Sequence, residues 1–104
     1  MAATIEAHGK GIELDEDGYL QNIDSWNINV AEYLAGIEGI ELTAEHWRLI
    51  TAIRLYYERN GASPLCGDIL RETGFTKKDL YRIFPSSGYR TACKLAGLPK
   101  PPEC

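Results

Sequence analysis

A chain of 104 residues, with 44% hydrophobic and 25% charged residues, is expected to form one globular domain with a modest core. Its net charge of −4 works against non-specific binding to nucleic acids, which depends on a cationic surface. No apolar run approaches the ~20 residues of a membrane span, and residues 1–17 lack the apolar core of a signal peptide, so we expect a cytoplasmic protein.

The N-terminal segment predicts a small β-hairpin. TIEAH (4–8) and GIEL (11–14) alternate apolar and polar residues around a Gly-Lys-Gly turn, and DEDG (15–18) marks a second turn. A lone hairpin is marginally stable, so we expect it to pack against helices. The stretch NVAEYLAGIEG (29–39) then predicts a short helix closed by glycine.

The strongest helical pattern is LTAEHWRLITAIRLYYERNG (42–61), which we expect to be the central helix of the core. Thr43 is a plausible N-cap, and Glu45 in the first turn favours the positive end of the helix dipole. Arg59 and Gly61 suit a C-terminus. Apolar residues recur at helical spacing along this segment: Trp47, Leu49, Ile50, Ile53, Tyr56 and Tyr57.

Three shorter helices are predicted after it. SPLCGDILRETG (63–74) offers Ser63 as N-cap and Pro64 as first helical residue. TKKDLYRIFP (76–85) offers Thr76 and Asp79 as a variant of the capping box. SGYRTACKLAG is expected to form the last helix, ended by glycine.

The final segment, LPKPPEC, cannot be helical, because its three prolines favour an extended, polyproline-like path. The expected fold is therefore mainly α, a small helical domain with an N-terminal β-hairpin and a flexible C-terminal arm. We divide the chain into a domain of residues 1–97 and a mobile arm of residues 98–104, with Gly97 as the hinge.

One segment suggests DNA binding. Residues 67–87 predict a helix-turn-helix, similar to the recognition segment of tetracycline-repressor-type regulators, and its second helix carries Lys77, Lys78, Tyr81 and Arg82. The chain is basic in its second part, with net charge +3 in residues 61–104 against −7 in residues 1–60. This favours an anionic partner or reflects ordinary surface scatter. DNA binding stays a minor hypothesis, because the whole domain is acidic and helix-turn-helix geometry is common as plain packing.

The arm places two thiols at a defined separation. Cys93 lies four residues before Gly97, and the fully extended path from Cys93 to Cys104 spans at most ~36–40 Å. If the arm folds back at Gly97, the two sulfurs can meet, and a disulfide closing this loop would contribute roughly 3 kcal/mol. Such an exposed bond would remain reducible, which suits a thiol that alternates between a partner and its own domain.

The other candidate residues point to packing. A lone cysteine on an amphipathic helix is often core filler, which is also the alternative for Cys93, and we interpret Cys66 in the same way. We interpret His46 as structural or solvent-facing. The spacing of cysteines and histidines predicts no metal site. We find no phosphate-binding loop, nucleophile elbow or acid–base pair, and nothing argues for a self-contained enzyme or a bound cofactor.

The C-terminal residues LYRIFPSSGYRTACKLAGLPKPPEC resemble the end of the DsrC/TusE family, which includes the gamma subunit of dissimilatory sulfite reductase. The block KLAGLPKP followed by cysteine is highly specific. DEDGYL, Trp26 and LTAEHWRLI extend the resemblance upstream, so that it covers nearly the whole chain. It implies a small, mainly helical fold with an N-terminal hairpin and a mobile arm.

The resemblance also implies a role for each thiol. Members carry sulfur on the arm's terminal cysteine, which matches Cys104. Those that work with sulfite reductase also have the upstream cysteine, which matches Cys93, whereas relatives in the tRNA thiolation relay generally lack it. The arm would then insert into the reductase catalytic subunits. Sulfur would leave as a trisulfide between the two cysteines, for reduction by a membrane-bound complex.

We therefore hypothesise a sulfur carrier, a protein co-substrate and not an enzyme. Cys104 would accept the sulfur as a persulfide, and Cys93 would resolve it into a disulfide or trisulfide. Arg90, Lys94 and Lys100 would stabilise thiolate or sulfite oxyanions and help to dock the arm. The alternatives are a sulfur relay toward tRNA thiolation, with sulfurtransferases as partners, and a helix-turn-helix DNA-binding protein.

Overall fold

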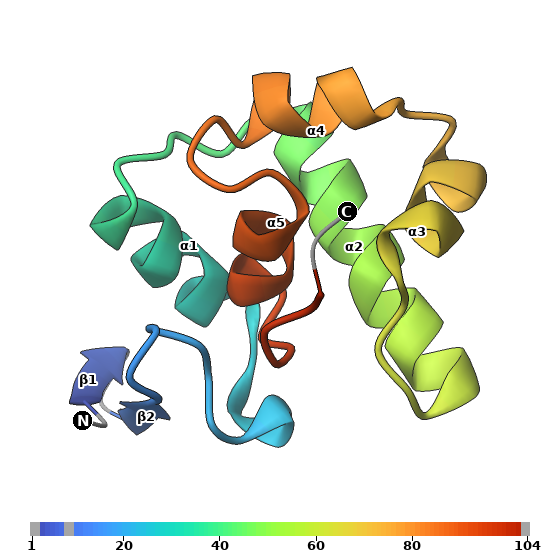
Figure 1. Ribbon diagram of the computed structural model, residues 1–104. Coiled ribbons are helices and arrows are strands. Elements are labelled where there is room, and N and C mark those ends of the chain that lie inside the picture. Colours follow the sequence, from blue (N-terminus) through green and yellow to red (C-terminus); the bar gives the residue numbers. More distant parts are fainter. Residues whose placement is uncertain (1–2, 8–9, 103–104) are drawn as a thin grey trace.

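The computed structural model describes residues 3–7 and 10–102. Strands β1 (Ala3–Ala7) and β2 (Lys10–Leu14) pair antiparallel, with Ile5 opposite Ile12. The predicted hairpin is thus confirmed, although residues 8 and 9 of its turn lie outside the described residues. The hairpin lies at one edge of the molecule, beside helix α1 (Figure 1).

Five α-helices form the rest of the described fold, as the sequence predicts in kind and order. A 3₁₀ turn at Ile23–Ser25 precedes the first of them. The helices are α1 (Ile28–Ile37), α2 (Ala44–Asn60), α3 (Cys66–Thr73), α4 (Lys77–Ile83) and α5 (Tyr89–Leu95). The predicted mainly helical class, with a helix-turn-helix-like α3–α4 element, is confirmed.

Helix α5 is short but lies at the centre of the fold, in contact with α1 and α2 (Figure 1). Its residues are apolar or small around most of the circumference, and Ala92, Leu95 and Ala96 are fully buried. Leu49, Ile50 and Ile53 of α2 supply a second fully buried row. The core therefore packs around the helix that precedes the C-terminal arm.

The helix ends follow simple capping chemistry, with one correction. Thr43 and Thr76 cap α2 and α4 as predicted. Ser63 and Pro64 do not begin α3, because Leu65 is its N-cap and the Asp68 carboxylate accepts the Leu65 N–H at 3.0 Å. An aspartate three residues after Leu65 satisfies this open N–H group, so the helix starts two residues later than the proline suggests.

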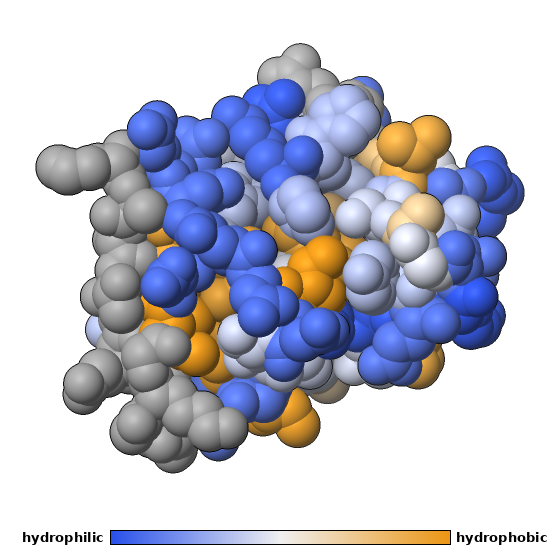
Figure 2. Space-filling view, turned by 90° about the horizontal axis from the view of Figure 1, so that it is seen from below, coloured by the Kyte–Doolittle hydropathy of each residue, from blue (hydrophilic) through white to orange (hydrophobic). Residues whose placement is uncertain are grey.

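The outer surface is mainly polar. Figure 2 shows, on the face seen from below, hydrophilic side chains over most of the area with separate apolar areas between them. Exposed large apolar residues occur on several elements, and six of those among residues 12–102 are at least two-fifths exposed: Ile28, Tyr33, Ile37, Leu55, Leu65 and Tyr81.

Candidate functional site

Cys93 lies in the middle of α5 and carries a free thiol. It is 1% exposed, and Tyr89 lies one turn earlier on the same helix. Burial raises the pKa of the Cys93 thiol to about 12, an effect that the neighbouring Tyr89 side chain only partly offsets. In this conformation Cys93 is a protonated and covered thiol at neutral pH, so its use as a nucleophile requires that it first be uncovered.

Tyr89 connects Cys93 to the segment before α3. Its hydroxyl donates a hydrogen bond of 2.6 Å to the Pro64 carbonyl oxygen, inside the protein. Burial, reinforced by the nearby Cys93, raises the pKa of Tyr89, so the phenol stays neutral and can keep donating. The first turn of α5 is therefore joined to the loop that leads into Cys66.

Cys66 is the first residue of α3, and it is 8% exposed. It is also disulfide-bonded. Our interpretation of Cys66 as a packing residue alone is therefore incomplete, since its sulfur is buried and covalently engaged. Cys66 lies far from the other two cysteines along the chain, so the spacing of the cysteines did not predict that Cys66 forms a disulfide.

The C-terminal end of α5 is held by a cluster that we call the α5 cap, made of Trp26, Arg54, Gly97 and Leu98. The Trp26 indole N–H donates to the Leu95 carbonyl at 2.8 Å. Gly97 has φ +77°, and a Cβ there would lie 2.5 Å from the Trp26 ring. Only glycine therefore fits this turn without displacing the indole.

Arg54 of α2 completes the α5 cap. Its guanidinium lies 4.5 Å from the centre of the Trp26 ring and donates to the Ala96 carbonyl at 3.2 Å. A cation suits this position, because the last carbonyls of a helix carry partial negative charge. Leu98 is fully buried, and its N–H donates to the Cys93 carbonyl at 3.1 Å. The root of the arm, residues 96–98, is thus held by Arg54 from α2 and by the hydrogen bond from Leu98 to α5.

Arg90 is one of the three cations that the sequence predicts to bind anions, and it contacts the C-terminal arm. The Arg90 Nε–H donates to the Pro101 carbonyl at 3.2 Å, and Pro101 is buried. Arg90 thus contacts the arm itself, and its role in docking the arm stays a prediction. The Arg90 carbonyl in turn accepts the Tyr19 hydroxyl at 3.2 Å, which ties this turn of α5 to the N-terminal region.

The two lysines pair with carboxylates of the acidic first half of the chain. Lys94 Nζ lies 3.5 Å from Glu38 and over the Tyr19 ring, while Lys100 Nζ lies 3.6 Å from Asp17. These contacts fasten α5 and the arm to α1 and to the turn after β2. Their predicted role toward thiolate or sulfite stays a prediction, as does the hinge at Gly97. Cys104 lies outside the described residues.

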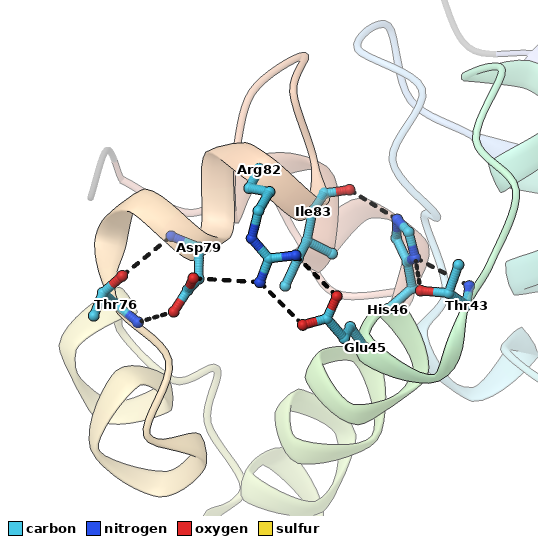
Figure 3. Close-up of polar contacts among 7 residues, drawn as sticks. All are labelled: Thr43, Glu45, His46, Thr76, Asp79, Arg82 and Ile83. Atoms are coloured by element: carbon cyan, nitrogen blue, oxygen red, sulfur yellow. Dashed lines mark hydrogen bonds and ion pairs between the residues drawn. The ribbon is translucent and has the colours of Figure 1, made fainter.

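On the surface formed by α3 and α4, Arg82 binds carboxylates, whereas DNA binding requires an arginine that contacts phosphate. Arg82 makes two hydrogen bonds to the Glu45 carboxylate, at 2.9 and 3.0 Å, and a third to Asp79 at 3.3 Å (Figure 3). These bonds raise the pKa of Arg82 and lower that of Glu45. The guanidinium is therefore already occupied by carboxylates, whereas Lys77 and Lys78 are exposed.

His46 has a structural role, as we expect from sequence. Its Nε2 and the Ile83 carbonyl are 2.8 Å apart, so Nε2 carries the proton and donates it (Figure 3). Its Nδ1 then accepts the Thr43 N–H at 3.0 Å, which completes the N-cap of α2. The imidazole thereby joins the start of α2 to the end of α4.

Metal-binding clusters and membrane-spanning helices are both absent from the described part of the chain. Among these residues, no three His, Cys, Asp or Glu side chains gather in a way that would hold a metal ion. None of the helices described is both long and apolar enough to cross a membrane.

The chain matches the family described as "DsrC like protein" over residues 6–104. It is 40% identical to the dissimilatory-type sulfite reductase subunit gamma of Nitratidesulfovibrio vulgaris, over 98% of each chain. It is 37% identical to the sulfurtransferase TusE of Salmonella paratyphi A, over 92% of this chain and 94% of TusE. The NMR structure of Allochromatium vinosum DsrC superposes with a TM-score of 0.89 at 39% identity, over 100% and 99% of the two chains. This protein belongs to the DsrC-like family.

Proposed function

We propose that the protein is a sulfur carrier that binds sulfur as a persulfide on Cys104 and serves as a protein co-substrate of a dissimilatory sulfite reductase. The observation that supports this most is the family match over residues 6–104, in a chain that has cysteine at both positions 93 and 104. The 40% identity to a sulfite reductase gamma subunit over nearly the whole chain supports the same partner.

The contacts at the root of the arm suit this function. The arm is held at Leu98 by the α5 cap and at Pro101 by Arg90, which leaves three residue steps from Pro101 to Cys104. Such a short segment restricts the positions that a Cys104 persulfide can reach, and so favours delivery to a partner's active site over random exchange. The partners would be the catalytic subunits of the reductase and a membrane-bound thiol/disulfide reductase complex, with the carrier in the cytoplasm.

Cys93 would act after sulfur is loaded. In the free protein its thiol is 1% exposed and its pKa is about 12, so it would not compete for sulfur donors. Exposure of α5 on the partner would uncover Cys93 and allow the trisulfide with Cys104 to form. Burial would therefore keep the second thiol inactive until the carrier reaches its partner.

A sulfur relay toward tRNA thiolation is the second candidate, and the 37% identity to TusE supports it. In that case sulfurtransferases would load and unload Cys104 directly, and Cys93 would have no chemical role. The two candidates differ in whether a Cys93→Ala variant still delivers its sulfur.

The test is intact mass spectrometry of the reduced protein before and after incubation with inorganic polysulfide, for the wild type and for Cys104→Ala. We expect the wild type to gain one sulfur atom that a dithiol removes, and Cys104→Ala to gain none. Cys93→Ala is the matched control and should still be loaded, because Cys93 is covered. Equal loading of Cys104→Ala and wild type would disprove the carrier mechanism.

A further inference from the structure

We propose that Arg90 is a positioning residue that couples the C-terminal arm to the burial of Cys93. Its bond to Pro101 keeps the arm on α5, and the loss of this bond releases the arm and uncovers the thiol. The inference rests on the proposed function, because it concerns when Cys93 becomes available to sulfur carried on the arm. It adds to that function the residue that controls this step.

The described part of the arm, residues 98–102, packs against the domain with one face. Leu98 and Pro101 are buried, whereas Pro99, Lys100 and Pro102 are exposed. This spacing of three residues matches the period of a polyproline-like segment, in which every third side chain lies on the same face. The arm is therefore attached to the domain through Leu98 and Pro101.

Both of these inward residues are hydrogen-bonded to α5. The Leu98 N–H donates to the Cys93 carbonyl at 3.1 Å. The Arg90 Nε–H donates to the Pro101 carbonyl at 3.2 Å. The arm turns at Gly97 and runs back beside α5, on which Arg90 and Cys93 lie about one turn apart (Figure 1). The arm thus spans the turn of α5 that carries the thiol.

Helix α5 is anchored at both ends by residues outside the arm. In its first turn, the Tyr89 hydroxyl donates to the Pro64 carbonyl. The Tyr19 hydroxyl donates to the Arg90 carbonyl in the same turn. At the other end, the indole and the guanidinium of the α5 cap bond the last carbonyls. Release of the arm leaves all these bonds in place, so it is a smaller change than displacement of the helix.

Leu98 connects the arm to the burial of Cys93. It is fully buried and belongs to the same hydrophobic core as Cys93, which is 1% exposed. Because the Leu98 N–H is bonded to the Cys93 carbonyl, outward movement of Leu98 opens the core beside this turn of α5. The arm is thus part of what covers the thiol.

Arg90 is the stronger of the two polar restraints on the arm beyond Leu98. Lys100 contacts Asp17 at 3.6 Å, but both side chains are about half exposed, and exposed ion pairs hold weakly. The bond from Arg90 to Pro101 is partly buried, and a hydrogen bond from a charged donor is stronger than a neutral one. The arm is therefore released when Arg90 lets go of Pro101.

The coupling has a functional consequence. Extension of the arm toward a partner breaks the bond between Arg90 and Pro101, and the same movement makes Cys93 available. In the free protein the arm stays on α5 and the thiol stays covered. A partner that draws the arm out therefore activates the second thiol where sulfur is delivered, and not earlier.

The first test measures how fast N-ethylmaleimide modifies Cys93 in the reduced, full-length protein. Trypsin isolates Cys93 on peptide 91–94, or on peptide 83–94 in Arg90→Gln, apart from the other two cysteines. We expect Arg90→Gln to raise the rate at Cys93 about tenfold, the effect of losing one hydrogen bond from a charged group. Arg90→Lys keeps a cationic donor and should restore most of the protection.

Two control variants distinguish release of the arm from general loosening. Lys100→Gln removes the exposed ion pair of the arm and should change the rate less than about twofold. Tyr19→Phe removes a hydrogen bond to the Arg90 carbonyl but leaves the bond to the arm, so its effect should be well below that of Arg90→Gln. Far-ultraviolet circular dichroism verifies that each variant is folded. Equal acceleration by Tyr19→Phe and Arg90→Gln would overturn the role of Arg90.

The second test repeats the measurement at urea concentrations below the unfolding transition. Release of the arm exposes little surface, so the rate at Cys93 should barely change with urea, whereas exposure through global unfolding rises steeply with it. Wild type gives this result without any substitution. A steep dependence on urea in wild type, or an unchanged rate in Arg90→Gln, would contradict the coupling.

The outcomes separate the two proposals, because the labelling uses no sulfur donor. If Arg90→Gln uncovers Cys93 but polysulfide loads no sulfur on Cys104, the coupling stands and the carrier function fails. If sulfur loads on Cys104 and Arg90→Gln leaves Cys93 as protected as in wild type, the carrier function stands and Arg90 does not control the thiol.

Discussion

The contacts of Arg82 on the α3–α4 surface differ from those of Arg54 at the C-terminal end of α5. On α4, Arg82 is half-exposed and pairs with carboxylates in contact with water. At the end of α5, Arg54 is less exposed, stacks on Trp26 and donates to a main-chain carbonyl. Exposed ion pairs contribute little to stability, whereas contacts in the α5 cap fix the position of the arm's root. The predictions below test this contrast.

The largest effect is expected at Gly97. A Gly97→Ala substitution would place a Cβ 2.5 Å from the Trp26 ring at a φ of +77°, so it should lower the free energy of unfolding by about 3 kcal/mol. Gly74→Ala is the matched control, because Gly74 has φ +79° and a Cβ added there would meet no atom within 4 Å. It should cost about 1 kcal/mol, from backbone strain alone. Urea denaturation measures both, and equal losses would contradict the packing of Gly97 against Trp26.

The buried thiol of Cys93 should make stability depend on pH. An unfolded cysteine loses its proton near pH 8.5, whereas folded Cys93 has a pKa of about 12 and keeps it. Unfolding in this interval releases a proton, so the stability is fully present below pH 8.5 and falls as the pH rises toward about 12.

Urea unfolding of the reduced protein at pH 8.5 and 10.5 measures this fall. Wild type should lose on the order of 2 kcal/mol more than Cys93→Ala over this interval, since the variant lacks the thiol. The comparison uses the difference between the two pH values, so a general loss of stability in the variant does not affect it. Parallel pH profiles would show that Cys93 titrates normally and is accessible.

A smaller effect is expected when the indole of Trp26 loses its N–H. Trp26→Phe leaves the Leu95 carbonyl without this donor and trims the ring under Arg54, so the free energy of unfolding should fall by about 1–2 kcal/mol. Trp47→Phe, at a half-buried tryptophan packed on the core, controls for the loss of ring area. A Trp26 variant no less stable than the Trp47 variant would argue against the role of this hydrogen bond.

The smallest effect is expected on α4. Arg82→Gln removes bonds to Glu45 and Asp79, but the pairs are exposed, so the free energy of unfolding should fall by less than it does in the Trp26 variant. The same variant tests the remaining DNA-binding hypothesis, together with Lys77→Gln and Lys78→Gln. We expect no salt-dependent binding of duplex DNA by wild type, and binding that these substitutions abolish would revive the hypothesis.

Sequence patterns predicted those parts of the fold that depend on local chemistry. The hairpin, the order of the helices and the caps at Thr43 and Thr76 follow from alternation, periodicity and capping residues. The predicted start of α3 was wrong, because Asp68 competes successfully with the Ser63–Pro64 signal.

The site was predictable only where the family motif marks it. Cys93 and the arm are part of that motif, but the contacts of Arg54 with Ala96 and of Tyr89 with Pro64 join residues far apart in the chain. Nothing in the periodicity of α2 distinguishes Arg54 from other polar residues.

The central claim is that sulfur is carried on the arm. The most direct test is tryptic mass mapping of thiol-blocked protein after loading with inorganic polysulfide. The account predicts the added sulfur on the peptide of residues 95–104 and none on residues 91–94. Added sulfur on residues 91–94, with an unmodified arm peptide, would contradict it.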